Sequence, residues 1–211
     1  MIRLRITFAK TPAMRYTGHL DLHRAWERTF RRAGLPLAYS QGFNPHPRLN
    51  LASALPLGFT GEAEVIDAWL DEDLPLSEVQ SALQPALPPG LQLVTIESVD
   101  LHLPALQTVL EASEYRLVFL EPFPALEEHV SALLSASSLP RRWRERDYDL
   151  RPLVLDIRLL PADCAGLLQL SLRLSAREAA TGRPEEVISV LGRDPNLARV
   201  HRTRLLFRSP A

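Results

Sequence analysis

The sequence is poor in cysteine: Cys164 is the only one, so no disulfide can form within the chain. No apolar stretch reaches the ~18 residues that a membrane helix needs. The N-terminal MIRLRITF lacks the apolar run and cleavage site of a secretory leader. Lysine is equally scarce, since Lys10 is the only lysine among 24 basic residues. These absences lead us to expect a chain that makes no membrane contact and works in the reducing cytoplasm.

The motifs of several common enzyme classes are also missing. The chain has no GxxxxGK[ST] phosphate loop, no GxGxxG, no GxSxG and no cysteine set for an iron–sulfur cluster. His19 and His23 have a spacing at which a helix could turn both toward one metal ion, but HLDLH lacks the acid of HExxH and no third ligand is near. The alternative is a helix start at which Thr17 or Asp21 satisfies backbone N–H groups. We therefore expect no metal and no cofactor in this chain.

Charge is strongly segregated, although the net charge is only −1. Residues 1–50 carry nine Arg and Lys residues against Asp21 and Glu27, whereas residues 51–100 carry nine Asp and Glu residues and no basic one. The first half therefore has a basic face or end, which is suited to polyanions, and a separate acidic one.

Hydrophobic periodicity predicts the same element order twice. The first half gives a strand at 2–8, a helix at 22–33 ended by Gly34, strands at 49–57 and 62–70, a helix at 76–87 and a strand at 91–99. The second half gives a strand at 115–120, a helix at 125–137, strands at 153–160 and 167–175, a helix at 185–191 and a strand at 200–207. This order predicts an α+β protein of two tandem ferredoxin-like (βαββαβ) domains with antiparallel sheets, at 1–100 and 114–211, joined by a linker at 101–113.

The stretch GFNPHPR, within residues 41–48, has the most restricted backbone in the chain. Gly42 permits a positive φ, Pro45 pushes Asn44 toward extended conformations, and Pro47 constrains His46 in the same way. Such a loop would hold Phe43, His46 and Arg48 in fixed directions, so that the ring stacks on a base and the guanidinium binds phosphate. A rigid turn that merely docks one strand is the alternative.

A second basic segment, residues 139–151, follows the first helix of the second half as residues 34–48 follow that of the first. It interleaves Trp143 with Arg141, Arg142, Arg144 and Arg146, a composition typical of nucleic-acid contact surfaces. The repetition predicts that the two loops share one cleft. A solvated loop without a partner is the alternative.

Acid–base chemistry is a weaker hypothesis. His19 or His46 could act as the acid or base of a metal-independent ribonuclease, with Tyr16, Lys10, Arg15 and Arg48 nearby in sequence. Histidines in basic loops are more often phosphate binders or structural donors than catalysts. Convergence of these residues in space decides between the two roles.

Several segments resemble the radical SAM-linked protein family, a bacterial family of unknown function found beside or fused to a radical SAM protein. The segments are GHLD, RRAGLPLAYSQGFNPHPR, ALPLG and DLRPLV. The resemblance implies a partner enzyme that carries an iron–sulfur cluster and S-adenosylmethionine, and an RNA context. The positions that match the family pattern are His19, Asp21, Arg24, Gly42, Phe43, Asn44, Pro45, His46, Arg48, Asp149, Leu150, Arg151 and Pro152. The tandem domains also resemble the CRISPR repeat-processing ribonucleases, an analogy of fold that licenses no chemistry.

The leading hypothesis is an accessory protein that binds ribosomal or transfer RNA and presents it to a radical SAM enzyme, without catalysis of its own. The alternatives are a metal-independent endoribonuclease and a protein-docking module in which the acidic stretch 62–78 meets a basic partner. Asp21, Gly42, Asn44, Pro45 and Pro47 are expected to shape the site. The residues expected to contact RNA are Arg15, Arg24, Arg28, Phe43, His46, Arg48, Arg142, Trp143 and Arg151.

Overall fold

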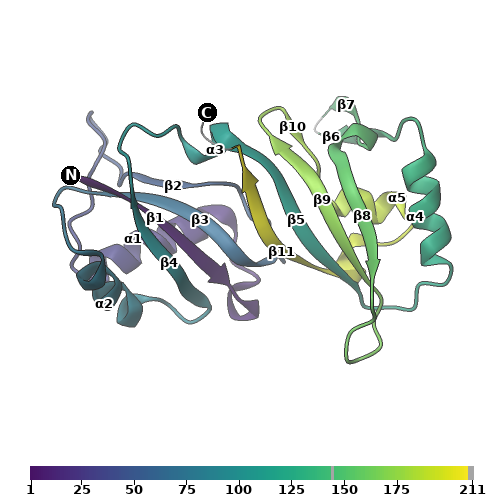
Figure 1. The fold of residues 1–211 in the computed structure, drawn as a ribbon, viewed down its shortest axis with the longest axis horizontal. Helices are drawn as coiled ribbons and strands as arrows, with labels where there is room; N and C mark the ends of the chain where they lie inside the picture. Colours follow the sequence, from purple (N-terminus) through teal and green to yellow (C-terminus); the bar gives the residue numbers. More distant parts are fainter. Residues whose placement is uncertain (144, 209–211) are drawn as a thin grey trace. The chain divides into compact units, whose positions relative to one another are not determined.

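The alternating N-terminal segment forms β1 (Ile2–Lys10), as its period predicts. The structure, a computed structural model, describes residues 1–143 and 145–208, and the chain divides into two units, Met1–Val109 and Leu110–Ala211. The elements of the first unit after β1 are the 3₁₀ turn η1 (Pro12–Met14), α1 (His19–Arg32), β2 (Leu49–Leu51), β3 (Thr60–Leu70), α2 (Leu76–Ala86), β4 (Leu91–Val99) and α3 (Leu106–Val109). Its strands lie in the order β2–β3–β1–β4, all antiparallel (Figure 1).

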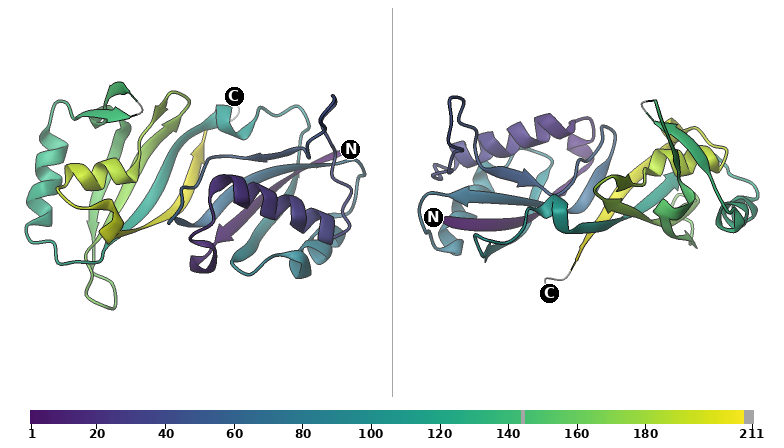
Figure 2. Two further views of the ribbon diagram at one scale, coloured as in Figure 1. Left: turned by 180° about the vertical axis from the view of Figure 1, so that it is seen from behind. Right: turned by 90° about the horizontal axis from the view of Figure 1, so that it is seen from above.

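The core of the first unit lies between this sheet and its helices. Leu4, Ile6 and Phe8 point from β1 toward Trp26 and Phe30 of α1, and all five are fully buried. The rings of Phe8 and Trp26 meet edge to face, with centroids 4.9 Å apart. Figure 2 shows α1 lying across this face of the sheet. The helical spacing of the apolar residues thus fixes which side of α1 is left for solvent.

The second unit repeats the strand–helix–strand–strand–helix–strand order of the first and adds further short strands. Its elements are β5 (Leu110–Phe119), α4 (Leu126–Ser135), β6 (Pro140–Trp143), β7 (Arg146–Asp149), η2 (Arg151–Leu153), β8 (Val154–Leu160), β9 (Gln169–Arg177), β10 (Ala180–Thr181), α5 (Pro184–Val190), η3 (Pro195–Leu197) and β11 (Ala198–Phe207). The four long strands lie in the order β8–β9–β5–β11, antiparallel, and β10 pairs with the end of β9. The core-facing side of β5 carries Tyr115, Leu117 and Phe119, and α5 lies over that side of the sheet (Figure 2).

The prediction of an α+β protein with largely antiparallel sheets is confirmed, but three segments differ from it. The strand expected at 49–57 ends at Leu51. Its last bond to β3 runs from the Ala52 N–H to the Val65 carbonyl, and Pro56 has no N–H with which to continue the pairing. The strand expected at 115–120 starts already at Leu110, so residues 110–113 of the predicted linker belong to β5, and 106–109 form α3. The loop expected at 139–151 contains the hairpin β6–β7.

Within the described residues, no helix has the length and apolar character required to cross a membrane.

Candidate nucleic-acid interface

The loop after α1 is closed at its base by backbone pairing. Ser40 donates its N–H to the His46 carbonyl (2.8 Å), Arg48 donates to the Ala38 carbonyl (2.8 Å), and the His46 N–H bonds to Ser40 Oγ (3.0 Å). Gly42 has a φ of 134°, a value that a residue with a Cβ rarely adopts. The loop is therefore a short projection with a fixed base and an exposed tip at residues 41–46.

Phe43 stands at the tip of this projection with a relative exposure of 107%. A fully solvated phenyl ring contributes nothing to the core, since burial would be worth about 1.5–3 kcal/mol. The rigid-turn alternative explains the prolines and Gly42, but it gives Phe43 no role. The ring is thus available to an external partner.

The base of the loop rests on Trp69 of β3. The backbone N–H of Trp69 donates to the Arg48 carbonyl (3.1 Å), and the Arg48 guanidinium carbon lies 4.7 Å from the centroid of the Trp69 indole. Arg3, the cross-strand neighbour of Trp69 on β1, places its own guanidinium carbon 4.8 Å from the same ring. Two cations thus contact one aromatic ring, an arrangement that fixes the direction of Arg48.

Arg3 is fully buried and lies at the centre of an ionic network. It donates to Asp67 Oδ2 at 2.6 and 3.0 Å, and Arg5 donates to the same carboxylate at 2.9 and 3.0 Å. The remaining donors of Arg3 bind the carbonyls of Leu103 and Pro104. The segment after β4 is therefore fastened to the sheet of the first unit by a buried arginine.

The solvent face of α1 carries the predicted arginines. Arg24 is exposed and forms an ion pair with Asp21 at 3.3 Å, while Arg31 lies 3.8 Å from Glu27. Arg28 is exposed, and no partner is recorded for it among the residues that the structure describes. Arg32 instead donates to the Ala86 carbonyl at the end of α2. The first three guanidinium groups remain accessible to anions, and Arg32 joins two helices.

The proposed ribonuclease residues are placed differently from one another. Lys10 is fully buried, and its ammonium donates to the carbonyls of Thr17 (2.8 Å), Phe59 (3.0 Å) and Arg15 (3.4 Å). Lys10 thus joins the segment of Arg15 and Thr17 to that of Phe59, and its buried ammonium is not accessible to a phosphate. His19 is the first residue of α1, and His46 lies on the exposed side of the loop.

His23 is used locally, because its Nε2 lies 3.4 Å from the Leu49 carbonyl. Across residues 1–143 and 145–208, no group of three or more His, Cys, Asp or Glu side chains is placed to hold a metal ion.

The DLRP segment of the second unit, residues 149–152, is held to neighbouring elements by hydrogen bonds. The Asp149 carboxylate accepts the N–H groups of Leu139 (2.7 Å) and Arg151 (2.9 Å), and these bonds lower the pKa of Asp149. Arg151 donates its guanidinium to the carbonyls of Leu134 (3.1 Å) and Val154 (3.2 Å), and Leu150 is fully buried. These contacts tie the β6–β7 hairpin to the end of α4 and the start of β8, and they engage two of the five N–H donors of the Arg151 guanidinium.

The β6–β7 hairpin itself presents Arg142 and Trp143. Arg142 is exposed and lies 3.9 Å from Asp147, and the Arg183 guanidinium carbon lies 4.2 Å from the Trp143 ring. Arg144 lies outside the described residues. Because the two basic loops belong to different units, their common cleft stays a prediction.

Sequence reasoning missed a basic sheet face on the second unit. One side of β8, β9, β5 and β11, which we call the arginine face, carries Arg116, Arg158, Ser171, Arg173, Arg199, His201 and Arg204 together with Glu114 and Asp156. The signal was present in the sequence, because each arginine occupies a polar position of an alternating strand. Only the register of the four strands brings these positions together.

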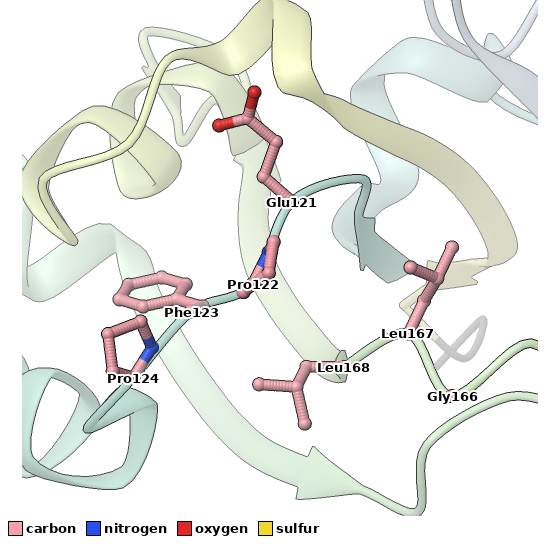
Figure 3. Close-up of a pocket in the computed structure, with 7 residues that line it drawn as sticks. All are labelled: Glu121, Pro122, Phe123, Pro124, Gly166, Leu167 and Leu168. Atoms are coloured by element: carbon pink, nitrogen blue, oxygen red, sulfur yellow. The ribbon is translucent and has the colours of Figure 1, made fainter.

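The second unit also has an open, mainly apolar hollow of about 500 Å³. Figure 3 shows its lining, which comes from Glu121, Pro122, Phe123, Pro124, Gly166, Leu167 and Leu168. Glu121 is the single ionisable side chain of this set. The hollow therefore offers no pair of groups for acid–base catalysis.

The structure thus defines an α+β protein of two units with exposed basic surfaces. The chain belongs to the family described as "uncharacterized protein conserved in bacteria (DUF2344)", whose model matches residues 3–184. A comparison with curated proteins gave no match.

Solved structures resemble this chain at low sequence identity. A Cbf5–Nop10–Gar1 complex matches with 13% identity and a TM-score of 0.52, over 98% of this chain and 50% of that chain. An H/ACA RNP bound to a substrate RNA containing 2′-deoxyuridine matches with 14% identity and a TM-score of 0.49, over 98% and 49%. An archaeal box H/ACA sRNP Nop10–Cbf5 complex matches with 13% identity and a TM-score of 0.47, over 98% and 49%. The chain spans about half the length of these solved chains, and identities this low show the fold alone.

Proposed function

We propose that this chain is an RNA-binding accessory protein that presents ribosomal or transfer RNA to a radical SAM enzyme and has no catalytic activity of its own. The partner enzyme would carry the iron–sulfur cluster and S-adenosylmethionine. The observation that carries the RNA part is the fully exposed Phe43 on a loop whose base is closed by hydrogen bonds. The radical SAM part rests on the resemblance of GHLD, GFNPHPR and DLRPLV to that family.

The fold supports a tandem arrangement. The orders β2–β3–β1–β4 and β8–β9–β5–β11 are the same when the four strands named for each unit are counted from that unit's own start. We infer that each unit is a variant of the ferredoxin-like fold, the second enlarged by β6, β7 and β10.

In the first unit, Phe43 would stack on an unpaired base, a contact worth about 1–3 kcal/mol. Arg24 and Arg28, both exposed on α1, would contact phosphates, and Arg48 would be held near the loop base by Trp69. His46, on the exposed side of the loop, would donate to phosphate or base. Pre-positioning by the loop base reduces the conformational entropy lost on binding.

Fluorescence anisotropy with a labelled tRNA transcript at several salt concentrations tests this proposal. Phe43→Ala should weaken binding about 5- to 150-fold, the equivalent of one lost stack, at an unchanged salt slope. Leu57→Ala is the matched control, because Leu57 is another exposed apolar residue of the first unit (63%). Equal affinity of wild type and Phe43→Ala would remove the stacking site, and binding that does not change with salt would remove the electrostatic component.

The two other hypotheses predict different results. An endoribonuclease would cleave total RNA in EDTA, and this cleavage would be lost in His46→Ala or His19→Ala. A docking module would co-purify with the radical SAM protein after nuclease treatment while the purified chain binds no RNA. The acidic stretch offers less than its composition suggests, because Glu64 and Asp67 are buried at 2% and 0% exposure.

A further inference from the structure

The arginine face forms two charged rows across the sheet of the second unit. Cross-strand pairing aligns His201, Arg116, Ser171 and Arg158 in one row and Arg204, Glu114, Arg173 and Asp156 in the next. Arg199 pairs with Val118 and extends the face beyond the first row. Figure 1 shows β8, β9, β5 and β11 side by side with no helix in front of them. The face is thus an open, ordered array of guanidinium groups.

The ion pairs of this face leave an excess of positive charge. Glu114 is shared by Arg173 (2.6 Å) and Arg204 (3.2 Å), and Arg158 pairs with Asp156 (2.8 Å) while 72% of its side chain stays exposed. Arg116 and Arg199 are both exposed, and within the described ranges no ion pair is recorded for either. Two carboxylates therefore face five guanidinium groups, and an incoming anion would restore the balance.

We propose that the arginine face is a second RNA-binding surface, which holds the phosphates of a single strand across β11, β5, β9 and β8. The proposal deepens the proposed function, because it names a site on the second unit for the same class of ligand. Arg116, Arg158 and Arg199 contact phosphates, and the Ser171 hydroxyl, between two of them, donates a hydrogen bond.

The dimensions of the sheet favour a strand of RNA over a single small anion. Neighbouring strands are about 4.8 Å apart, so Arg116 and Arg158, with β9 between them, are separated by about 10 Å. The row as a whole crosses four strands, about 14 Å, which is more than one phosphate spans and suits consecutive phosphates of a chain. An open four-stranded sheet is also the platform on which RNA-recognition motifs hold single strands, and guanidinium planes can stack on splayed bases as aromatic rings do. Arginine suits this task because its planar fork binds phosphate through two N–H groups.

The full chain is titrated with fluorescein-labelled oligouridine at salt concentrations from 50 to 200 mM. Arg116→Gln/Arg158→Gln/Arg199→Gln removes three charges from exposed positions of the sheet, and Arg24→Gln/Arg28→Gln/Arg31→Gln removes three from α1 and so tests the first-unit site in the same assay. With a slope of about −0.7 per phosphate, three lost contacts flatten the plot of log K against log salt by about 2. Over this salt range the wild type should then lose about 20-fold more affinity than the sheet variant. Arg116→Lys/Arg158→Lys/Arg199→Lys should keep most of the slope.

Each result bears on the inference directly. A sheet variant with the wild-type slope overturns it, as does a lysine variant that loses as much slope as the glutamine variant. Displacement of the RNA by polyglutamate of equal charge at the same concentration also overturns it, because the face would then be a general anion surface. If the sheet variant loses the slope while Phe43→Ala and the α1 variant do not weaken binding, the first-unit site fails and this inference stands. If the wild-type chain binds no RNA, both fail.

Discussion

Replacement of Asp67 by alanine should destabilise the first unit severely. The Asp67 carboxylate is fully buried and neutralises Arg3, which is itself 1% exposed. Removal of one partner leaves a buried guanidinium without a counter-ion, which costs about 3–5 kcal/mol. Arg5, with 23% of its side chain exposed, loses the same partner at a smaller cost. For a unit of this size, 3 kcal/mol corresponds to a fall in Tm of about 12 °C or more.

Urea denaturation monitored by circular dichroism and tryptophan fluorescence measures this change. Trp26 and Trp69 lie in the first unit and Trp143 lies in the second, so the fluorescence of a Trp143→Phe background follows the first unit. Asp21→Ala is the control, because it breaks an exposed ion pair with Arg24 and should cost no more than about 1 kcal/mol. A loss below about 1 kcal/mol for Asp67→Ala would refute the reasoning.

A double variant separates charge from packing. Arg3→Met/Asp67→Leu replaces the pair by apolar side chains, and such replacements are often neutral compared with the intact pair. It should therefore be more stable than Asp67→Ala alone. It should also release the Leu103 and Pro104 carbonyls from Arg3, and limited proteolysis would then show faster cleavage in the segment after β4.

Further predictions concern other buried or constrained groups. Lys10→Met should lower the free energy of unfolding by about 1.5–3 kcal/mol or more, since it removes charged hydrogen bonds to Thr17 and Phe59, and chemical denaturation measures the loss. Asp149 has a pKa below its ordinary value of 3.8, so the ionised carboxylate stabilises the folded state fully above that value, and this contribution is lost as the pH falls through the lowered pKa. Asp149→Asn should therefore make the free energy of unfolding less dependent on pH in acid, and denaturant titrations at several pH values measure this. Gly42→Ala should strain the loop, where φ is 134°, and should reduce RNA affinity in the anisotropy assay with little change in Tm.

Local periodicity predicted most of the regular elements. The alternation in β1 and the spacing of Leu22, Trp26 and Phe30 are strong signals, because each matches one period only. Gly34 was a reliable stop and has a φ of 67°. The restricted neighbours of Phe43 predicted a fixed loop, whereas the exposure of its ring comes from the structure alone.

Features that depend on distant partners were beyond local patterns. The β6–β7 turn uses Glu145 at a φ of 67°, a conformation for which glutamate gives no signal. The phosphate contact of Arg151 stays a prediction, but no local pattern indicated that its guanidinium also donates to the Leu134 and Val154 carbonyls. The arginine face was missed because Arg116 and Arg158 become neighbours only through β9.

The contact of Trp69 with both Arg3 and Arg48 gives the protein a built-in optical reporter. Indole emission responds to nearby charge, and these two cations arise from different places: one anchors the segment after β4, the other begins at the base of the Phe43 loop. A ligand that moves Arg48 away from the ring changes the electric field at the Trp69 indole, and hence its emission, while Arg3 stays in place. Occupancy of the loop can therefore be followed in the unlabelled protein, and Trp26→Phe/Trp143→Phe, which removes the other two indoles of the chain, isolates that signal.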